Sequence, residues 1–171
     1  MPPDRYEEMA KTNYWDALFE LRDKQRAEKR GGIQVIKGAR LPVEVNRQGL
    51  MRWYQHPEIN DTVLSTLLVF QQEIPPGSRS GRMKFGGNQV IYILEGKGYT
   101  LIDGVRHDWA AGDVLNLPMK TQGIVVQHFN ADTERRARFV AVEPNLFAAA
   151  GVDRGCGFEQ LESAPEHART K

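Results

Sequence analysis

The sequence predicts an all-β barrel that carries a helix at its N-terminal end. Short runs of β-branched and aromatic residues follow one another from residue 33 to residue 143, separated by turns rich in Gly, Pro and Asp. Short strands at such spacing are typical of a sandwich or a closed barrel. Residues 5–30 instead interleave apolar side chains with charges, which indicates a helix.

Size and composition exclude several kinds of partner. The chain has 171 residues, enough for one domain with a substantial core. Its net charge of +1 gives no electrostatic argument for binding nucleic acid or an anionic membrane. No apolar run approaches the ~18 residues of a membrane-spanning helix, and the N-terminus lacks the apolar core of a signal peptide. Cys156 is the only cysteine, so we expect a cytoplasmic protein without an internal disulfide.

The predicted N-terminal helix covers residues 5–30 and ends at Gly31-Gly32, because Gly is a common helix terminator. Trp15 and Phe19 are its large aromatic residues. They pack either on the barrel of the same chain or on another subunit. Both alternatives stay open, and in the second Trp15 and Phe19 are the expected partner contacts.

The expected strands follow in order along the chain. Pro75-Pro76-Gly77 forms a turn after a long run rich in Val, Leu and Phe, and Asp103-Gly104 is a hairpin signal. Strands are expected at residues 33–36, 50–54, 62–71, 89–94, 98–102, 113–117, 124–129 and 138–143.

Three segments carry a family resemblance: residues 75–81, 86–99 and 111–118. Together they resemble the cupin family, and in particular the branch of gentisate dioxygenases, which act on hydroxylated aromatic compounds. The resemblance implies a single cupin barrel, also called a double-stranded β-helix or jelly roll, because the chain holds no internal repeat. The domains expected on this basis are an N-terminal helical extension at 1–31, a cupin barrel at 32–145 and a C-terminal tail at 146–171.

The first cupin motif places His-x-His and a glutamate between two glycines. Here Gly77 and Gly96 keep the frame, while Met83, Phe85 and Gln89 occupy the three ligand positions with every spacing preserved. A divalent metal needs imidazole or carboxylate ligands, which thioether, phenyl and amide groups do not replace. We therefore expect no metal in this chain.

The second cupin motif places a histidine four residues before an asparagine. Gly112 and Pro118 hold its first spacing, and Asn130 closes it. Counting back from Asn130 puts Val126 at the ligand position and His128 on the same face of the strand. A different count makes His128 itself the ligand. Neither count gives a competent set of metal ligands.

The side chains at the degenerate positions permit two interpretations. In the first, they fill the barrel interior as an apolar plug. In the second, they line a dry pocket for an aromatic ligand, and Gln89 anchors a polar group of it. The resemblance carries no catalytic residue onto the chain, because the matching positions are the ones that differ. The pocket-lining set is Met83, Phe85, Gln89, Val126 and His128.

Other groups give weaker signals. His56 lies at a strand end, His107 in a turn-like segment and His167 in the tail, and we expect structural or surface roles for all three. Three cations between Arg79 and Lys84 form a basic cluster. This cluster is expected to be a solvated loop or a site for an anion or an acidic partner.

A cupin frame without its metal ligands is similar to the small subunits of two-component hydroquinone 1,2-dioxygenases. The resemblance implies a metal-free accessory subunit bound to a larger cupin-type catalytic partner, in an assembly such as a heterotetramer. Fe(II) would lie on that partner, and the complex would open hydroquinone, a small phenolic substrate, to 4-hydroxymuconic semialdehyde with O₂. Two alternatives stay open: a homodimeric, non-enzymatic cupin that binds an aromatic ligand, and a metalloenzyme with an unusual ligand set around His128 or His56.

Overall fold

The structure is a computed structural model that describes residues 4–59, 61–64, 66–145 and 159–168. The described residues form two compact units. One holds the residues up to Val35 together with Asp61–Leu64, and the other holds the rest. Cys156 lies outside the described residues. None of the helices in the described ranges has the length and hydropathy that crossing a bilayer requires.

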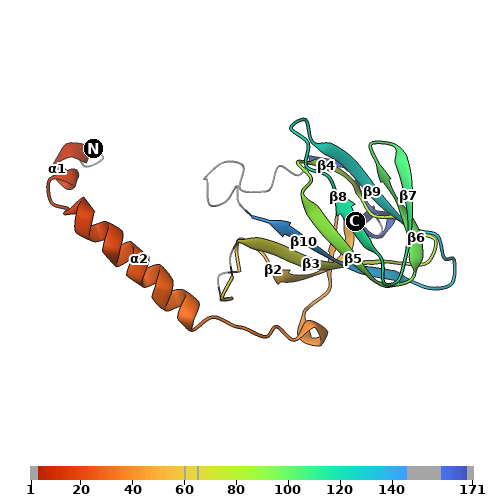
Figure 1. Cartoon of the computed structure of the whole chain (residues 1–171), viewed down its shortest axis with the longest axis horizontal. Coiled ribbons are helices and arrows are strands. Elements are labelled where there is room, and N and C mark those ends of the chain that lie inside the picture. Colours follow the sequence, from red (N-terminus) through yellow and green to blue (C-terminus); the bar gives the residue numbers. More distant parts are fainter. Residues whose placement is uncertain (1–3, 60, 65, 146–158, 169–171) are drawn as a thin grey trace. The chain divides into compact units, whose positions relative to one another are not determined.

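The N-terminal unit contains two helices where the sequence predicted one. Helix α1 covers Arg5–Met9 and helix α2 covers Tyr14–Arg30 (Figure 1). The break occurs because Asn13 caps the second helix: its side-chain oxygen accepts a hydrogen bond from the main-chain nitrogen of Asp16 at 3.2 Å. Gly31 ends α2 as predicted.

The prediction of a strand at residues 33–36 is wrong. Only Ile33 pairs, in a single parallel bridge with Thr62. Its main-chain nitrogen donates to the carbonyl of Asp61 at 2.7 Å. The run is apolar enough for a strand, but in the described chain no neighbouring strand continues the pairing beyond this one bridge.

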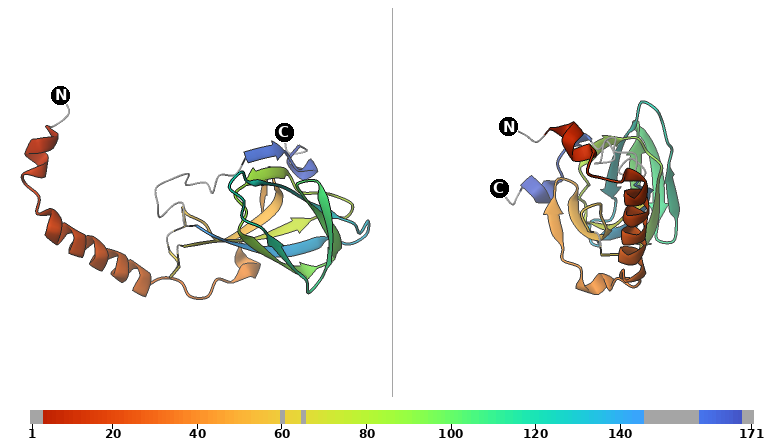
Figure 2. Two further views of the ribbon diagram at one scale, coloured as in Figure 1. Left: turned by 45° about the horizontal axis from the view of Figure 1, so that its top comes forward. Right: turned by 90° about the vertical axis from the view of Figure 1, so that its left-hand side faces the viewer.

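The second unit is a barrel of two antiparallel sheets, which confirms the predicted all-β fold class (Figures 1 and 2). The six-stranded sheet has the order β1-β2-β3-β10-β5-β8, and the five-stranded sheet has the order β11-β4-β9-β6-β7. The strands are β1 Glu44–Asn46, β2 Gly49–Gln55, β3 Leu67–Ile74, β4 Arg82–Phe85, β5 Gln89–Glu95, β6 Lys97–Ile102, β7 Val105–Ala110, β8 Val114–Leu117, β9 Ile124–Asn130, β10 Ala137–Pro144 and β11 Glu159–Glu162. Two short helices complete the unit: a 3₁₀ turn η1 at Gly38–Arg40 and α4 at Pro165–Ala168.

Strands that come late in the chain hold central places in both sheets. β10 lies between β3 and β5, and β9 lies between β4 and β6. On β10 every second side chain is buried, beginning with Ala137 and Phe139. This alternation directs one face of each sheet into a shared apolar interior.

Four strands were not predicted: β1, β4, β7 and β11. β1, β7 and β11 are short or mostly exposed, so their side chains lack a clear apolar alternation. β4 has only four residues, although Met83 and Phe85 alternate into the core. His107 accordingly lies in the middle of β7 and not in a turn. The hairpin signal is confirmed, because Asp103 and Gly104 join β6 to β7 with φ angles of 50° and 84°.

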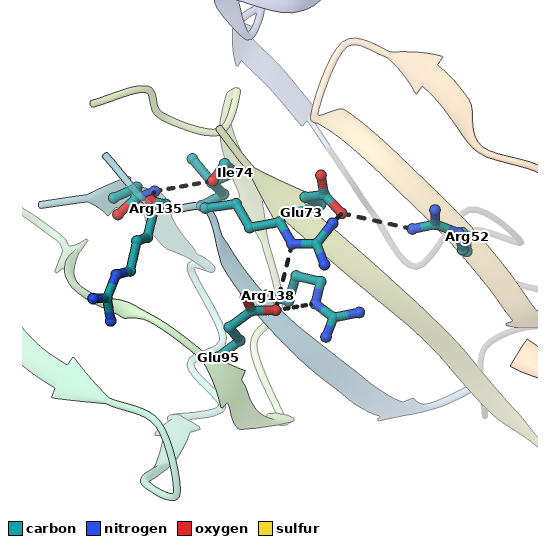
Figure 3. Close-up of polar contacts among 8 residues, drawn as sticks. Arg52, Glu73, Ile74, Glu95, Arg135 and Arg138 are labelled. Carbon is teal, nitrogen blue, oxygen red and sulfur yellow. Dashed lines mark hydrogen bonds and ion pairs between the residues drawn. The ribbon is translucent and has the colours of Figure 1, made fainter. Parts of the chain in front are cut away.

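A chain of ion pairs crosses the outer face of the six-stranded sheet (Figure 3). Glu73 on β3 meets Arg52 at 3.8 Å and Arg136 at 3.4 Å. Glu95 on β5 meets Arg136 at 3.4 Å and Arg138 at 2.6 Å. The hydrogen bond from Arg138 holds the pKa of Glu95 below its usual value. Arg136, Arg138 and Glu95 are partly exposed, so their ion pairs add little stability, whereas Glu73 and Arg52 are more buried.

Candidate functional site

The cupin frame of the first motif is present in the barrel. Gly77 adopts a φ of 64° in the turn after β3, and Gly96 a φ of 88° between β5 and β6. A Cβ atom at Gly96 would come within 2.8 Å of the carbonyl oxygen of Arg136, so only glycine fits. Between these two turns lie β4, which carries Met83 and Phe85, and β5, which begins at Gln89.

The structure brings the predicted positions on β4 and β9 together. The two strands are antiparallel neighbours, and Met83 stands opposite Val126 in their register. Phe85 is likewise opposite Ile124. All four side chains are buried, with exposures between 0% and 7%. A closed apolar contact therefore occupies the place where this motif would direct metal ligands into the barrel.

Gln89 has a partner that the sequence analysis missed. Its amide nitrogen donates to the carboxylate of Glu143 on β10 at 2.7 Å, and both residues are buried. The signal was available, because Phe139, Ala141 and Glu143 alternate along one predicted strand and must share its inner face. The amide of Gln89 therefore supplies a hydrogen bond to a buried carboxylate in the barrel interior.

His128 is fixed in a buried hydrogen-bond chain. Its Nδ1 lies 2.8 Å from the hydroxyl of Thr100, which accepts a hydrogen bond from the indole nitrogen of Trp109 at 2.9 Å. Its ring packs edge-on against Phe139, with centroids 4.9 Å apart. Burial lowers the pKa of His128 to about 4. The neutral ring accepts the Thr100 hydroxyl proton at Nδ1, so the Thr100 hydroxyl donates to His128 and accepts from Trp109.

The donor chemistry at these positions does not fit a metal ion. A thioether, a phenyl ring, an amide and an isopropyl group occupy the four ligand positions, and none supplies the imidazole or carboxylate donors that iron or zinc prefers. Among the described residues no three His, Cys, Asp or Glu side chains gather closely enough to hold a metal. We therefore derive no reaction step at this place in the chain.

A separate cavity of about 440 Å³ opens beside the degenerate site. Of the five predicted pocket residues only Met83 lines it, while the other four belong to the filled interior. Most of its wall comes from β1 to β3, which the sequence analysis did not connect with a site. The lining residues are Val45, Asn46, Arg47, Gln48, Met51, Trp53, Phe70, Gln72, Met83, Gln160 and His167.

Trp15 and Phe19 lie together on α2. Their ring centroids are 5.7 Å apart in an edge-to-face arrangement, and the guanidinium of Arg22 lies 4.9 Å from the Phe19 ring centroid. Trp15 is 69% exposed and Phe19 is 42% exposed. The expectation that they contact a partner stays a prediction.

The weaker candidates separate into local roles. His56 accepts a hydrogen bond at Nδ1 from the main-chain nitrogen of Glu58 at 3.1 Å. In the predicted basic cluster, Arg79 pairs with Glu162, and Lys84 lies 3.9 Å from Glu159. The carboxylates of β11 therefore meet two of the three cations, beside the antiparallel pairing of β11 with β4.

Comparisons with known proteins agree with the fold. No protein-family model matches the chain. A predicted oxalate decarboxylase of Thermotoga maritima is 24% identical, with a TM-score of 0.52 over 64% of this chain and 96% of that one. A polyketide cyclase of Streptomyces resistomycificus is 13% identical, with a TM-score of 0.56 over 79% of this chain and 89% of that one. A cupin-like protein of Thermotoga maritima, 19% identical, has a TM-score of 0.52 over 74% of this chain and 93% of that one.

The fold is therefore a single cupin barrel with an N-terminal helix. In sequence the chain is similar to a 5-aminosalicylate 1,2-dioxygenase of Comamonas sp., at 25% identity over 117 residues. The matched region is 68% of this chain but only 29% of that protein's length. The solved structures thus show the cupin fold, and the sequence comparison adds a weak similarity to an aromatic dioxygenase.

Proposed function

We propose that this chain is the small, metal-free accessory subunit of a heteromeric Fe(II)-dependent dioxygenase that cleaves aromatic rings. The iron would lie on a larger cupin-type partner. The observation that carries the proposal is a complete cupin frame whose ligand positions hold buried non-ligands, Met83, Phe85, Gln89 and Val126. A barrel kept without its metal ligands is consistent with a structural role beside a catalytic subunit.

The weak likeness to an aromatic dioxygenase supports the reaction class. The expected substrate is hydroquinone, which takes up both atoms of one O₂ molecule and becomes 4-hydroxymuconic semialdehyde. No oxidant besides O₂ is needed for this balance. The substrate rests on the resemblance of the sequence to hydroquinone 1,2-dioxygenase small subunits.

The N-terminal helix α2 is the proposed contact with the partner. Trp15 and Phe19 present two large aromatic side chains from one stretch of helix, and aromatic residues are enriched in interface cores. Leu18, between them in sequence, is 60% exposed. Covering these side chains would give the complex apolar contact area that the helix alone does not bury.

The test begins with purification of the tagged chain from cells that make it naturally, grown on a phenolic carbon source. We expect a larger cupin that contains iron to be recovered in a fixed ratio. The recombinant pair should consume O₂ with hydroquinone, and neither chain alone should do so. Recovery of this chain alone, or full activity of the large chain without it, would refute the accessory role.

A substitution pair tests the helix contact. Trp15→Ala is expected to weaken the complex by about tenfold or more, since aromatic anchors dominate interface energetics. Tyr6→Ala, which removes another exposed aromatic side chain from α1, is the matched control. Both variants should leave the thermal unfolding of the isolated chain unchanged. Loss of folding in Trp15→Ala would instead identify Trp15 as a core residue.

One observation favours a second candidate. The cavity of about 440 Å³ suits a homodimeric, non-enzymatic cupin that binds an aromatic ligand. Sedimentation separates the candidates, because this one predicts a self-contained dimer that recruits no iron protein. A monomer that pairs only with the iron-containing chain would exclude it.

A further inference from the structure

The C-terminal segment 159–168, here called the strap, bridges the two sheets beside the cavity (Figure 2). Its strand β11 pairs with β4 of the five-stranded sheet, and its helix α4 lies against β1 and β2 of the six-stranded sheet. Gln160 and His167, one from each part of the strap, line the cavity of about 440 Å³. The strap therefore supplies part of the cavity wall at the place where it joins the two sheets.

The side-chain contacts that hold the strap are mainly polar. Beside the ion pairs of β11 with Arg79 and Lys84, the hydroxyl of Ser78 donates a hydrogen bond to Glu166 on α4 at 2.7 Å. The side chains in the two ion pairs are between 39% and 62% exposed, so each pair contributes little stability and is screened by salt. The basic cluster seen in the sequence thus holds an acidic segment of its own chain, through contacts that break easily.

Apolar contacts of the strap are few. In the described part of the chain, the apolar core cluster includes no strap residue. Leu161, the large apolar side chain of the strap, is 43% exposed. Ala164 is buried, and its main-chain nitrogen donates to the carbonyl of Arg47 at 2.9 Å. Segments with few buried apolar contacts open at lower free energy than the core does, so the strap can lift while the barrel stays folded.

Two thioether groups lie behind the strap. Met51 on β2 and Met83 on β4 both line the cavity, and they are only 3% and 7% exposed. Met83 stands opposite Gln160 in the register of β4 and β11. Lifting the strap would remove this neighbour and one wall of the cavity, which would open a path from solvent to both sulfur atoms.

We propose that the strap is a gate: residues 159–168 detach from β4 and from the turn between β1 and β2, admit small molecules to the cavity, and close again without unfolding of the barrel. The contacts with Arg79, Lys84 and Ser78 set how often the gate opens. The proposal depends neither on the accessory role nor on the identity of a ligand, because access to the cavity is measured on this chain alone.

The test measures oxidation of methionines in the full chain by tert-butyl hydroperoxide. The peroxide transfers one oxygen atom to an accessible thioether, which becomes a sulfoxide, and leaves as tert-butanol. Peptide mass spectrometry gives a rate for each methionine, and Met119, which is 73% exposed, is the internal reference. We expect Met51 and Met83 to react at least about tenfold more slowly than Met119, through the open state.

Salt and one substitution should open the gate. Raising NaCl from about 0.1 M to about 1 M shortens the screening length from about 10 Å to about 3 Å, and should speed oxidation of the two buried methionines about threefold relative to Met119. Glu162→Gln, which removes the ion pair with Arg79, should have a similar effect at low salt. The matched control is Asp108→Asn, which removes a comparable exposed ion pair with Arg106 on β7 and should leave both rates unchanged.

A disulfide should hold the gate closed. Glu159 stands opposite Lys84 in the register of the two strands, so Glu159→Cys with Lys84→Cys places two thiols at paired positions. Both substitutions are made in a Cys156→Ser chain, which alone is the reference. The disulfide form should oxidise its two buried methionines at least about tenfold more slowly than the reference, with Met119 unaffected.

Several results would overturn the proposal. Buried methionines that react as fast as Met119, or at rates that neither salt nor Glu162→Gln changes, would show that the strap does not control access. Equal rates with and without the disulfide would show the same, and if the disulfide does not form, salt and Glu162→Gln decide.

Hydrogen exchange of the same samples separates the gate from global unfolding. Salt should speed exchange of the strap amides and leave that of the β10 amides unchanged, and an acceleration shared by β10 would contradict the gate. Failure here leaves the accessory role intact, since that role is measured by iron recovery and O₂ consumption of the complex.

Discussion

Acidification is expected to destabilise the barrel through His128, whose pKa falls from its usual 6.5 to about 4 because the ring is buried. Above pH 6.5 the ring is neutral in both the folded and the unfolded chain, so it adds no pH dependence. Between pH 6.5 and pH 4 the unfolded chain binds a proton that the folded chain does not, so stability falls as the pH falls. With about 1.4 kcal/mol per pKa unit, the loss reaches about 3 kcal/mol near pH 4.

The hydrogen-bond chain gives this loss a structural cause. A proton added at Nδ1 of His128 would face the hydroxyl of Thr100, which already accepts from Trp109. The Thr100 hydroxyl would then have to accept twice, and its own proton would lose its acceptor. Protonation therefore costs the burial of a charge and leaves the Thr100 hydroxyl proton without its acceptor.

The assay is urea unfolding at pH 7, 6, 5 and 4 for the wild type and His128→Asn. The variant has no titrating ring at this position, so its stability should change with pH only through other groups. Between pH 7 and pH 4 the wild type should therefore lose about 3 kcal/mol more unfolding free energy than His128→Asn does. The control is His107→Asn, which makes the same change at an exposed position on β7.

The result that refutes the reasoning is a difference that stays constant across this pH range. Such a result would mean that His128 titrates alike in the folded and unfolded chain, and that the barrel interior is open to water at this position. A loss equal in wild type and His128→Asn would assign the acid sensitivity to carboxylates. Glu95 and Glu162, whose pKa values arginine partners hold low, are the first of these to examine.

Two further predictions concern the filled site, and a third concerns the close contact between β6 and β9. The variant Met83→His, Phe85→His, Val126→His and Gln89→Glu should bind one metal ion, measured by titration calorimetry. A folded variant that binds no metal would contradict the assigned register. Gln89→Leu leaves Glu143 without the amide and should lower the unfolding free energy by about 2 kcal/mol in urea; an unchanged value would mean that the amide is dispensable. Gly98→Ala, whose Cβ would overlap the carbonyl of Phe129, should lower the thermal midpoint by several degrees, and wild-type melting would be the opposing result.

Strands were predictable where burial imposed alternation. The strands predicted at 89–94 and 124–129 are present at Gln89–Glu95 and Ile124–Asn130, because alternate side chains along them enter the core. β11 was missed because its sequence, Glu-Gln-Leu-Glu, is short and acidic and carries no such alternation. It pairs as an antiparallel strand with β4, which is remote in sequence, and ion pairs to Arg79 and Lys84 accompany that pairing.

The sites were predictable only in part. The spacing between two glycines identified Met83, Phe85 and Gln89 as the ligand positions, although the strand that carries Met83 and Phe85 was not predicted. The partner of Gln89 lies far along the chain, on β10, and only the strand order β10-β5 brings the two together.

The position of β10 between β3 and β5 has a consequence for synthesis of the protein. A ribosome releases β3 and β5 well before β10, so the emerging chain holds two strands whose facing edges stay open until residues 137–144 appear. Open strand edges recruit other chains, and pairings between distant segments form slowly. Translation that stalls before residue 137 should therefore yield an aggregation-prone product, and cells that make this barrel gain from completing it quickly.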